Sequence, residues 1–193
     1  MKPINKYKVI FWDFDGVILD SNEVRDLGFI EALKEYPSAQ VEKLLLFHKK
    51  NGGLSRYVKF RYFFEEIRKE TTNKETMEGL LDRFSLIMKD QLVNPYYLIE
   101  ENLKVIKELY GNSAMHIVSG SDQTELRYLC KCLKIDHFFE SINGSPTPKI
   151  ELVKKLIQYH KYLIKDCVLI GDSVNDFEAA QANEISFVGY NYP

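Results

Sequence analysis

The sequence predicts a doubly wound α/β fold, in which helices cover both faces of a parallel sheet, with a helical subdomain inserted into it. Short apolar runs that suit buried strands alternate with amphipathic stretches that suit helices. One long segment after the first apolar run shows helical periodicity and no convincing strand. A chain of 193 residues has room for one core with one sizeable insertion.

Four apolar runs are the predicted strands. The first, residues 8–14, stops at a carboxylate and then at a glycine, a pattern that suits a strand buried on both faces. The other three runs span residues 115–118, 167–170 and 185–188. Amphipathic helical patterns lie between the strands and span residues 97–110, 122–133 and 149–163. This alternation predicts a parallel sheet.

The inserted helical segment interrupts that rhythm. A helix-start signal at residues 20–22 opens it. It ends near Asn94-Pro95, where proline disfavours continuation of the preceding helix. We therefore expect an α/β core domain of residues 1–20 and 93–193 and a helical domain of residues 21–92.

Composition and charge narrow the class of protein. A formal net charge of −2 and a pI of about 6.1 give no global basic field of the kind that nucleic-acid binders carry, so any anion site must be local. Cys130, Cys132 and Cys167 suit a reducing compartment better than a disulfide framework. No apolar run is long enough to span a bilayer. We expect a soluble, cytoplasmic protein with no nucleic-acid or membrane partner.

Three of the predicted strands are each followed by a side chain that could react with a phosphate group or bind it. Asp13 follows the first strand, Ser119 the second and Asp172 the third. In open α/β sheets, ligands bind outside the carboxyl ends of the strands, so residues distant in the sequence can meet in one crevice. The sequence therefore predicts a single site built from these residues.

Acidic residues at this predicted site suit a metal ion. Asp13 and Asp15 flank one residue, and two carboxylates held so close repel unless a cation or a shared proton intervenes. With Asp172 and Asp176 they form an oxygen-ligand set for a hard ion such as Mg²⁺. Two structural alternatives stay open. The first pair could be a polar turn, and Ser173 with Asp176 also fits a capping box.

A lysine and a serine-glycine pair are candidate phosphate-binding groups. Lys149 falls in the first turn of a predicted helix, where a cation is unfavourable by about 0.3–1 kcal/mol and a bound anion would reverse that penalty. Ser119 and Gly120 precede another helix and could cradle a phosphate with a hydroxyl and backbone N–H groups. A solvated lysine and a simple turn are the structural alternatives.

Four segments, taken in order, resemble the four motifs of the haloacid dehalogenase superfamily, whose core is a Rossmann-like sheet. They are Asp13-Phe14-Asp15-Gly16-Val17, Ser119, Lys149 and Gly171-Asp172-Ser173-x-x-Asp176. Together they span nearly the whole chain. The helical insertion directly after the first motif resembles the cap of the subgroup that contains phosphoglycolate phosphatase and β-phosphoglucomutase.

The resemblance implies a phosphatase mechanism. Asp13 would attack the substrate phosphorus, and Asp15 would protonate the leaving oxygen and then deprotonate water. Mg²⁺ would be held by Asp13, the Asp15 carbonyl and Asp172, with Asp176 as a further candidate. Lys149 and Ser119 would bind the phosphoryl oxygens. The implied substrate is a small phosphorylated metabolite, with sugar phosphates among the candidates.

The predicted cap offers a hint about substrate. Residues 48–61 contain five lysine and arginine residues and no acid, and Gly52-Gly53-Leu54-Ser55-Arg56 resembles the specificity loop of β-phosphoglucomutase. Arg56 could reach over the crevice and bind an anion, or it could belong to a solvated basic face.

Phosphomutase chemistry is the alternative to hydrolysis. Arg25 stands where related mutases and several phosphatases carry histidine, and we take this departure as an argument against a mutase. A receiver-type signalling module also uses an acidic magnesium site, a hydroxyl and a lysine, but it would not need a large helical cap. The sequence does not predict the natural substrate or the oligomeric state.

Overall fold

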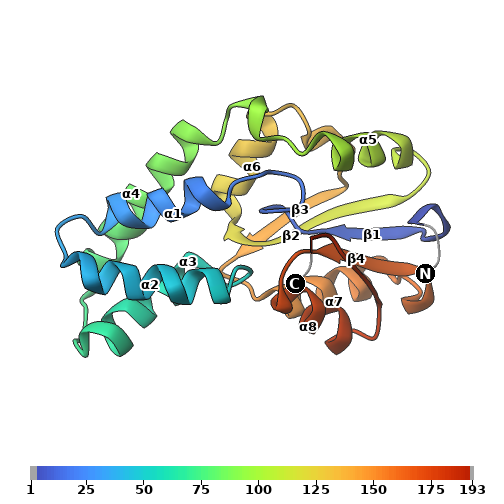
Figure 1. Cartoon of the computed structure of the whole chain (residues 1–193). Coiled ribbons are helices and arrows are strands. Elements are labelled where there is room, and N and C mark those ends of the chain that lie inside the picture. Colours follow the sequence, from blue (N-terminus) through green and yellow to red (C-terminus); the bar gives the residue numbers. More distant parts are fainter. Residues whose placement is uncertain (1–3, 192–193) are drawn as a thin grey trace.

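A five-stranded sheet, in which every pair of neighbours is parallel, forms the core of the computed structural model, which describes residues 4–191 (Figure 1). The strands are β1 (Val9–Trp12), β2 (Ala114–Asp122), β3 (Ser141–Ser145), β4 (Cys167–Gly171) and β5 (Ser186–Gly189). Their order across the sheet is β3-β2-β1-β4-β5. The predicted doubly wound α/β fold is confirmed.

Helices cover both faces of this sheet. On one face lie α5 (Glu100–Leu109) and α6 (Gln123–Cys132), and on the other lie α7 (Lys149–His160) and α8 (Val174–Ala182) (Figure 1). Side chains alternate along β1, so Ile10 and Trp12 pack into one hydrophobic cluster, whereas Val9 and Phe11 pack into the other. All four are buried, which explains why β1 reads as a continuous apolar run.

Strand β3 was missed by the sequence prediction. Its sequence, Ser-Ile-Asn-Gly-Ser, contains a single large apolar residue, because the strand lies at the edge of the sheet and its first three residues are only half buried. Strand β2 continues to Asp122, beyond the predicted end at residue 118, and its pairing with β3 shifts register between Val118 and Asp122.

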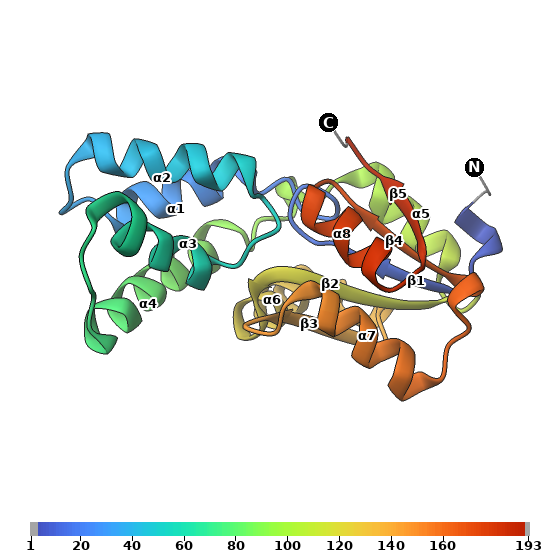
Figure 2. The same ribbon diagram turned by 90° about the horizontal axis from the view of Figure 1, so that it is seen from below.

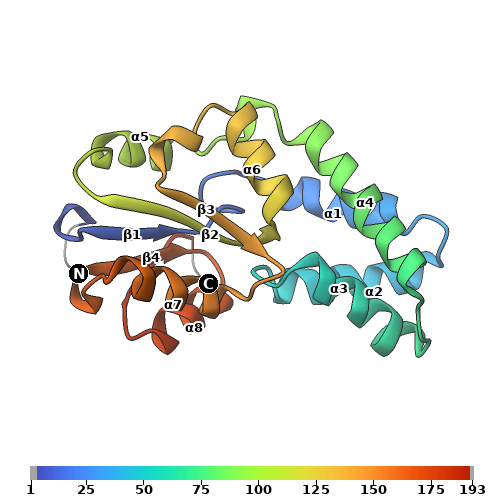
Figure 3. The ribbon, with the colours of Figure 1, turned by 180° about the vertical axis from the view of Figure 1, so that it is seen from behind.

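The inserted segment forms a separate layer of helices beyond the carboxyl ends of the strands (Figures 1, 2 and 3). Its helices are α1 (Asn22–Ala32), α2 (Ser38–Lys50), α3 (Arg56–Tyr62), the π-helix η2 (Phe63–Arg68) and α4 (Lys74–Gln91). Short 3-10 turns elsewhere are η1 (Ile4–Lys6), η3 (Pro95–Tyr97), η4 (Asp136–Phe138) and η5 (Ile164–Asp166). We infer that residues 21–92 form a cap domain, and we call this layer the cap.

Two adjacent linkers join the cap to the sheet. The Asp20 N–H donates to the Tyr97 carbonyl at 2.8 Å, and the Ile99 N–H donates to the Ile18 carbonyl at 3.0 Å. Leu19 and Leu98 form an antiparallel bridge between these bonds. The chain therefore leaves and re-enters the core at one place. Among residues 4–191, none of the helices combines the length and the apolar composition that a membrane crossing requires.

The cap has an aromatic core of its own. The ring of Phe29 on α1 lies 5.3 Å from that of Phe60 on α3 and 4.6 Å from that of Phe84 on α4, centroid to centroid, and all three are buried. These contacts bury one side of each of three helices. Packing between helices, rather than contact with the sheet, is thus a main source of cap stability.

Replacing Phe29 with alanine should therefore lower the free energy of unfolding by about 3–5 kcal/mol, the range for a large aromatic side chain lost from a core. Urea denaturation followed by circular dichroism measures this change. Leu46→Ala on α2, where the side chain is 71% exposed, is the matched control and should stay within about 0.5 kcal/mol of the wild type. Equal effects of the two substitutions would contradict the packing described.

Candidate active site

Asp13 lies at the end of β1 in a tightly packed turn. Its side chain is buried, and its N–H donates to the Ile170 carbonyl of β4 at 2.9 Å. Gly16 follows with a φ of +75°, and a Cβ at this position would lie 2.0 Å from Asp172 Oδ2. Only glycine fits there, because both the left-handed backbone and the approach of Asp172 exclude a side chain. The turn thus brings the carboxyl ends of β1 and β4 together.

Lys149 is held between two carboxylates. Its Nζ lies 2.8 Å from Asp13 Oδ1 and also donates to Asp176 Oδ1, and the side chains of all three residues are buried. Burial alone would lower the pKa of Lys149, but Asp13 and then Asp176 raise it above the ordinary lysine value. The lysine therefore stays a cation. The structure places it in the first turn of α7, as the sequence predicts.

Carboxylate oxygens of Asp13, Asp172 and Asp176 lie within 4.8 Å of one another. Burial, and then the charge of Asp176, raises the pKa of Asp13 well above its ordinary value, although Lys149 opposes the shift. Burial and Asp176 likewise raise the pKa of Asp172 to about 6. Three acids with one lysine leave uncompensated negative charge. Such an oxygen-only donor set fits a hard divalent ion such as Mg²⁺.

Asp176 also has a structural role. Its Oδ2 accepts hydrogen bonds from the Ser173 N–H at 3.0 Å and the Ser173 hydroxyl at 2.6 Å, which forms the capping box that the sequence allowed at the start of α8. Because Lys149 takes Oδ1, both oxygens of Asp176 are already engaged. Asp13 and Asp172 are the less committed candidate ligands.

The Asp15 side chain points away from that acidic cluster and toward the cap. Its Oδ1 accepts from Arg25 Nε at 2.9 Å and from the Ser21 hydroxyl at 2.5 Å, and its Oδ2 accepts from the Ser121 hydroxyl at 2.5 Å. Burial alone would raise the pKa of Asp15, but the charge of Arg25 and these hydrogen bonds hold it below its ordinary value. Asp15 is therefore a carboxylate in this arrangement.

Glu125, on α6 of the core, joins two arginines of the cap. Its Oε1 accepts from Arg25 Nη1 at 2.8 Å, and its Oε2 accepts from Arg56 Nη1. Arg56 Nη2 also donates to the Ser85 hydroxyl at 2.7 Å. Glu125 is fully buried, and its two cations compensate its charge. Sequence reasoning missed Glu125, because an acid in a first helical turn after Asp122 is typical of ordinary capping.

A cavity of about 50 Å³ lies between the sheet and the cap. Residues predicted for the site line it: Asp13, Asp15, Arg56, Ser119, Gly120 and Asp172. Lys149 and Asp176 lie behind Asp13, joined to it through the lysine ion pair. Arg25, His48 and Lys59 line the cavity from the cap, and the sequence alone had assigned them no role in it.

The glycine loop of the cap touches the strand that carries Ser119. A Cβ on Gly120 would lie 2.3 Å from the Gly53 carbonyl oxygen, so the two backbones are in direct contact. Behind this loop, Lys59 Nζ donates to the Gly52 carbonyl at 3.0 Å and lies 2.7 Å from His48 Nδ1. Burial lowers the pKa of Lys59 to about 7. The predicted basic loop therefore reaches the cavity.

A comparison with protein families identifies the chain. The family model described as "Haloacid dehalogenase-like hydrolase" matches residues 9–190. The chain belongs to this family. The resemblance found in the four motifs is confirmed, and so is the prediction that the protein is a hydrolase.

This hydrolase is similar to proteins named phosphoglycolate phosphatase. One from Mannheimia succiniciproducens is 27% identical over an alignment of 200 positions, which covers 97% of this chain and 87% of the relative. A solved structure of a predicted phosphoglycolate phosphatase from Haemophilus somnus aligns with a TM-score of 0.77 at 19% identity, covering 98% of this chain and 88% of that one. The magnesium-bound HAD-hydrolase YfnB from Bacillus subtilis, described as revealing interdomain movement, aligns with a TM-score of 0.71 at 16% identity and covers 96% and 89%.

The Arg25→Gln substitution should raise the pKa of Asp15, because burial would no longer be opposed by a neighbouring cation. In the wild type, the depressed pKa of Asp15 stabilises the fold above the ordinary Asp value of about 4, and this stability is lost as pH falls through the folded-state pKa. Carbon-13 NMR titration of the Asp15 carboxyl measures the shift. Arg127→Gln, an exposed change on α6, is the control, and an unchanged Asp15 pKa in both variants would refute the assigned cause.

Proposed function

We propose that this hydrolase is a magnesium-dependent phosphatase that cleaves a small phosphate monoester, with Asp13 as its covalent nucleophile. The observation that carries the proposal is the meeting of Asp13, Lys149 and Asp172 at the ends of separate elements, beside a cavity that Asp15 also lines. This is the arrangement that the family resemblance implies. The phosphatase names of the relatives support it.

The first half-reaction transfers the phosphoryl group to the enzyme. A carboxylate oxygen of Asp13 attacks the phosphorus, and the bond from phosphorus to the leaving oxygen breaks. Asp15, a carboxylate in the structure, first takes up a proton from solvent and then donates it to the leaving oxygen. Lys149, the Ser119 hydroxyl and backbone N–H groups near Gly120 would hold the phosphoryl oxygens. A divalent ion held by Asp13, the Asp15 carbonyl and Asp172 would supply positive charge that screens the anionic nucleophile from the anionic phosphate.

The second half-reaction returns the enzyme to its starting state. Asp15, now a carboxylate, takes a proton from water, and the resulting hydroxide attacks the phosphorus of the aspartyl-phosphate. Inorganic phosphate leaves, Asp13 is restored, and Asp15 releases its proton to solvent. The contacts of Asp15 with Arg25, Ser21 and Ser121 favour its carboxylate form, which is the form that this step requires.

The cavity suggests what the leaving group carries. Arg25 Nη2 and Arg56 Nε are buried and have no hydrogen-bond partner among residues 4–191. A substrate with an acceptor group close to its phosphate, such as a carboxylate or hydroxyl, would satisfy these donors. Phosphoglycolate carries a carboxylate close to its phosphate group and is therefore the first substrate to test, followed by small sugar phosphates. We expect the reaction to take place in the cytoplasm.

Hydrolysis has more support than phosphomutase chemistry. A mutase needs a second phosphate site in the cap, for which Arg56 is the candidate residue. Two of its three nitrogens are already engaged by Glu125 and Ser85, which leaves Nε alone and no two-pronged fork for a second phosphate. Arg25, at the position where related mutases and several phosphatases carry histidine, contacts Asp15 directly.

The Asp13→Asn substitution should abolish phosphate release from phosphoglycolate and from a panel of small phosphate esters, because an amide is a poor nucleophile. Asp15→Asn should lower kcat by about 10²–10⁴-fold, the usual contribution of a general acid and base. Chelation of divalent ions should stop turnover and added Mg²⁺ should restore it. Phosphate release and circular dichroism are measured together.

Asp20→Asn is the matched control for these variants, because Asp20 is an exposed acid in the loop after the same strand and lies outside the cavity. It should keep wild-type activity. If the Asp13→Asn variant still releases phosphate, or if a chelator does not slow the wild type, then Asp13 and a divalent ion do not carry out the reaction. Accumulation of a positional isomer of a sugar phosphate, without release of phosphate, would favour the mutase.

The Arg56→Ala substitution should lower kcat/KM for substrates with an anionic leaving group by roughly 10- to 150-fold. This corresponds to about 1.5–3 kcal/mol of lost transition-state stabilisation, the range for one charge-assisted hydrogen bond. p-Nitrophenyl phosphate, whose leaving group offers no carboxylate, should be nearly unaffected. Arg61→Ala, an exposed change on the same helix, should alter neither rate. An equal loss on both substrates would mean that Arg56 acts on cap structure rather than on substrate choice.

A further inference from the structure

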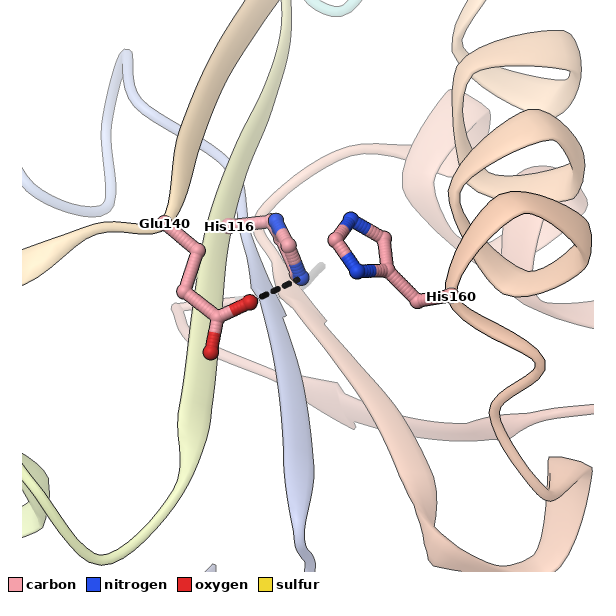
Figure 4. Close-up of side chains that lie close together, drawn as sticks. All are labelled: His116, Glu140 and His160. Atoms are coloured by element: carbon pink, nitrogen blue, oxygen red, sulfur yellow. Dashed lines mark ion pairs between the residues drawn. The ribbon is translucent and has the colours of Figure 1, made fainter.

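A second cluster of metal-binding side chains lies outside the active-site cavity. His116 stands near the start of β2, Glu140 directly precedes β3, and His160 is the last residue of α7. One candidate ligand atom from each lies within 4.8 Å of the others. Figure 4 shows the two imidazole rings and the carboxylate directed toward one another from three separate elements. None of the three residues lines the cavity that contains Asp13.

Hydrogen bonds hold His116 in a fixed orientation. Its Nδ1 lies 2.8 Å from the Ser141 hydroxyl, and its Nε2 lies 2.9 Å from the Tyr162 hydroxyl and 3.8 Å from Glu140 Oε2. The Tyr162 hydroxyl also donates to Glu140 Oε2 at 3.1 Å, so it lies between two of the candidate ligand atoms. An ion bound here would displace this hydroxyl and take the Nε2 lone pair, with the proton of His116 on Nδ1 and donated to Ser141. Histidines that bind metals commonly have such a donor contact on their second nitrogen.

The burial and charge of the three side chains also suit an ion. His116 is fully buried. His160 is exposed at the end of its helix, and its ring stacks on Tyr162 with the planes 4° apart. Glu140 is half exposed and adds one negative charge. The two histidines are thus the nitrogen donors and Glu140 is the oxygen donor.

We propose that His116, Glu140 and His160 bind a divalent transition-metal ion such as Zn²⁺. Two imidazoles and one carboxylate are a donor set that zinc accepts, with a water molecule as the fourth ligand. Mg²⁺ prefers oxygen ligands alone, so the two clusters of this enzyme differ in the ion that they select. A tetrahedral ion with bonds of about 2.0–2.1 Å needs ligand atoms closer together, at about 3.4 Å, so the exposed Glu140 and His160 side chains must move inward.

The position of this site indicates a structural role. The ion would connect the last turn of α7 to β2 and to the segment that leads into the edge strand β3. The first turn of the same helix carries Lys149, which holds Asp13. An ion at the far end of α7 would therefore stabilise the helix on the sheet without taking part in the reaction.

Titration with ZnCl₂ tests the site, carried out on the whole protein with excess Mg²⁺ present to occupy the carboxylate cluster. Calorimetry should give one Zn²⁺ per chain, the unfolding temperature should rise, and Co²⁺ in place of Zn²⁺ should give the visible absorption of a four-coordinate site. His160→Ala and Glu140→Gln should each weaken binding by about tenfold or more, since even outer-shell changes cost about 10–100-fold. Both side chains are exposed, so these variants should still fold.

His137→Ala is the matched control, because His137 is exposed and lies outside the cluster. It should bind Zn²⁺ as the wild type does. The proposal fails if the protein takes up no Zn²⁺ under these conditions, or if His160→Ala binds it as tightly as the wild type. It also fails if the tight Zn²⁺ site disappears in Asp172→Asn, because the ion would then belong to the active-site carboxylates.

Discussion

The pairing of buried acids with cations from other elements is the constraint on which the rest of this structure depends. Asp13, Asp176 and Glu125 are buried and Asp15 is partly buried where the sheet meets the cap, and an unpaired charge in the buried positions would cost several kcal/mol. Lys149 compensates two of these acids, and Arg25 with Arg56 compensates the others. The first turn of α7, which carries Lys149, and the helices α1 and α3, which carry the two arginines, must therefore lie against these acids.

Much of the core could be predicted from sequence, because its signals are local. The apolar run of β1 ends at Asp13, the run of β4 ends before Asp172, and the proline before Lys149 marks the start of a helix. Parallel strands bring their carboxyl ends to one edge, so the order of the motifs along the chain is enough to bring these residues together. The capping box of Ser173 and Asp176 could also be predicted, because its two residues are only three positions apart.

The rest of the site depends on contacts between segments distant in the chain. Nothing near Glu125 indicates that two arginines, 100 and 69 positions before it, will converge on its carboxylate. Arg25 attracted notice only as a departure from a family pattern, yet it controls the charge of Asp15. Strand β3 escaped prediction because an edge strand needs apolar residues on less of its surface than a central strand does.

The meeting of Gly120 with the carbonyl of Gly53 limits how far the two domains can approach. No side chain lies between them, since even a methyl group on Gly120 would come within 2.3 Å of that oxygen. Main-chain atoms move less than side chains and have no rotamers to exchange. At this point the cap therefore meets the core main chain to main chain, so any closer approach of the two domains requires a backbone to move and cannot be gained by rearranging side chains.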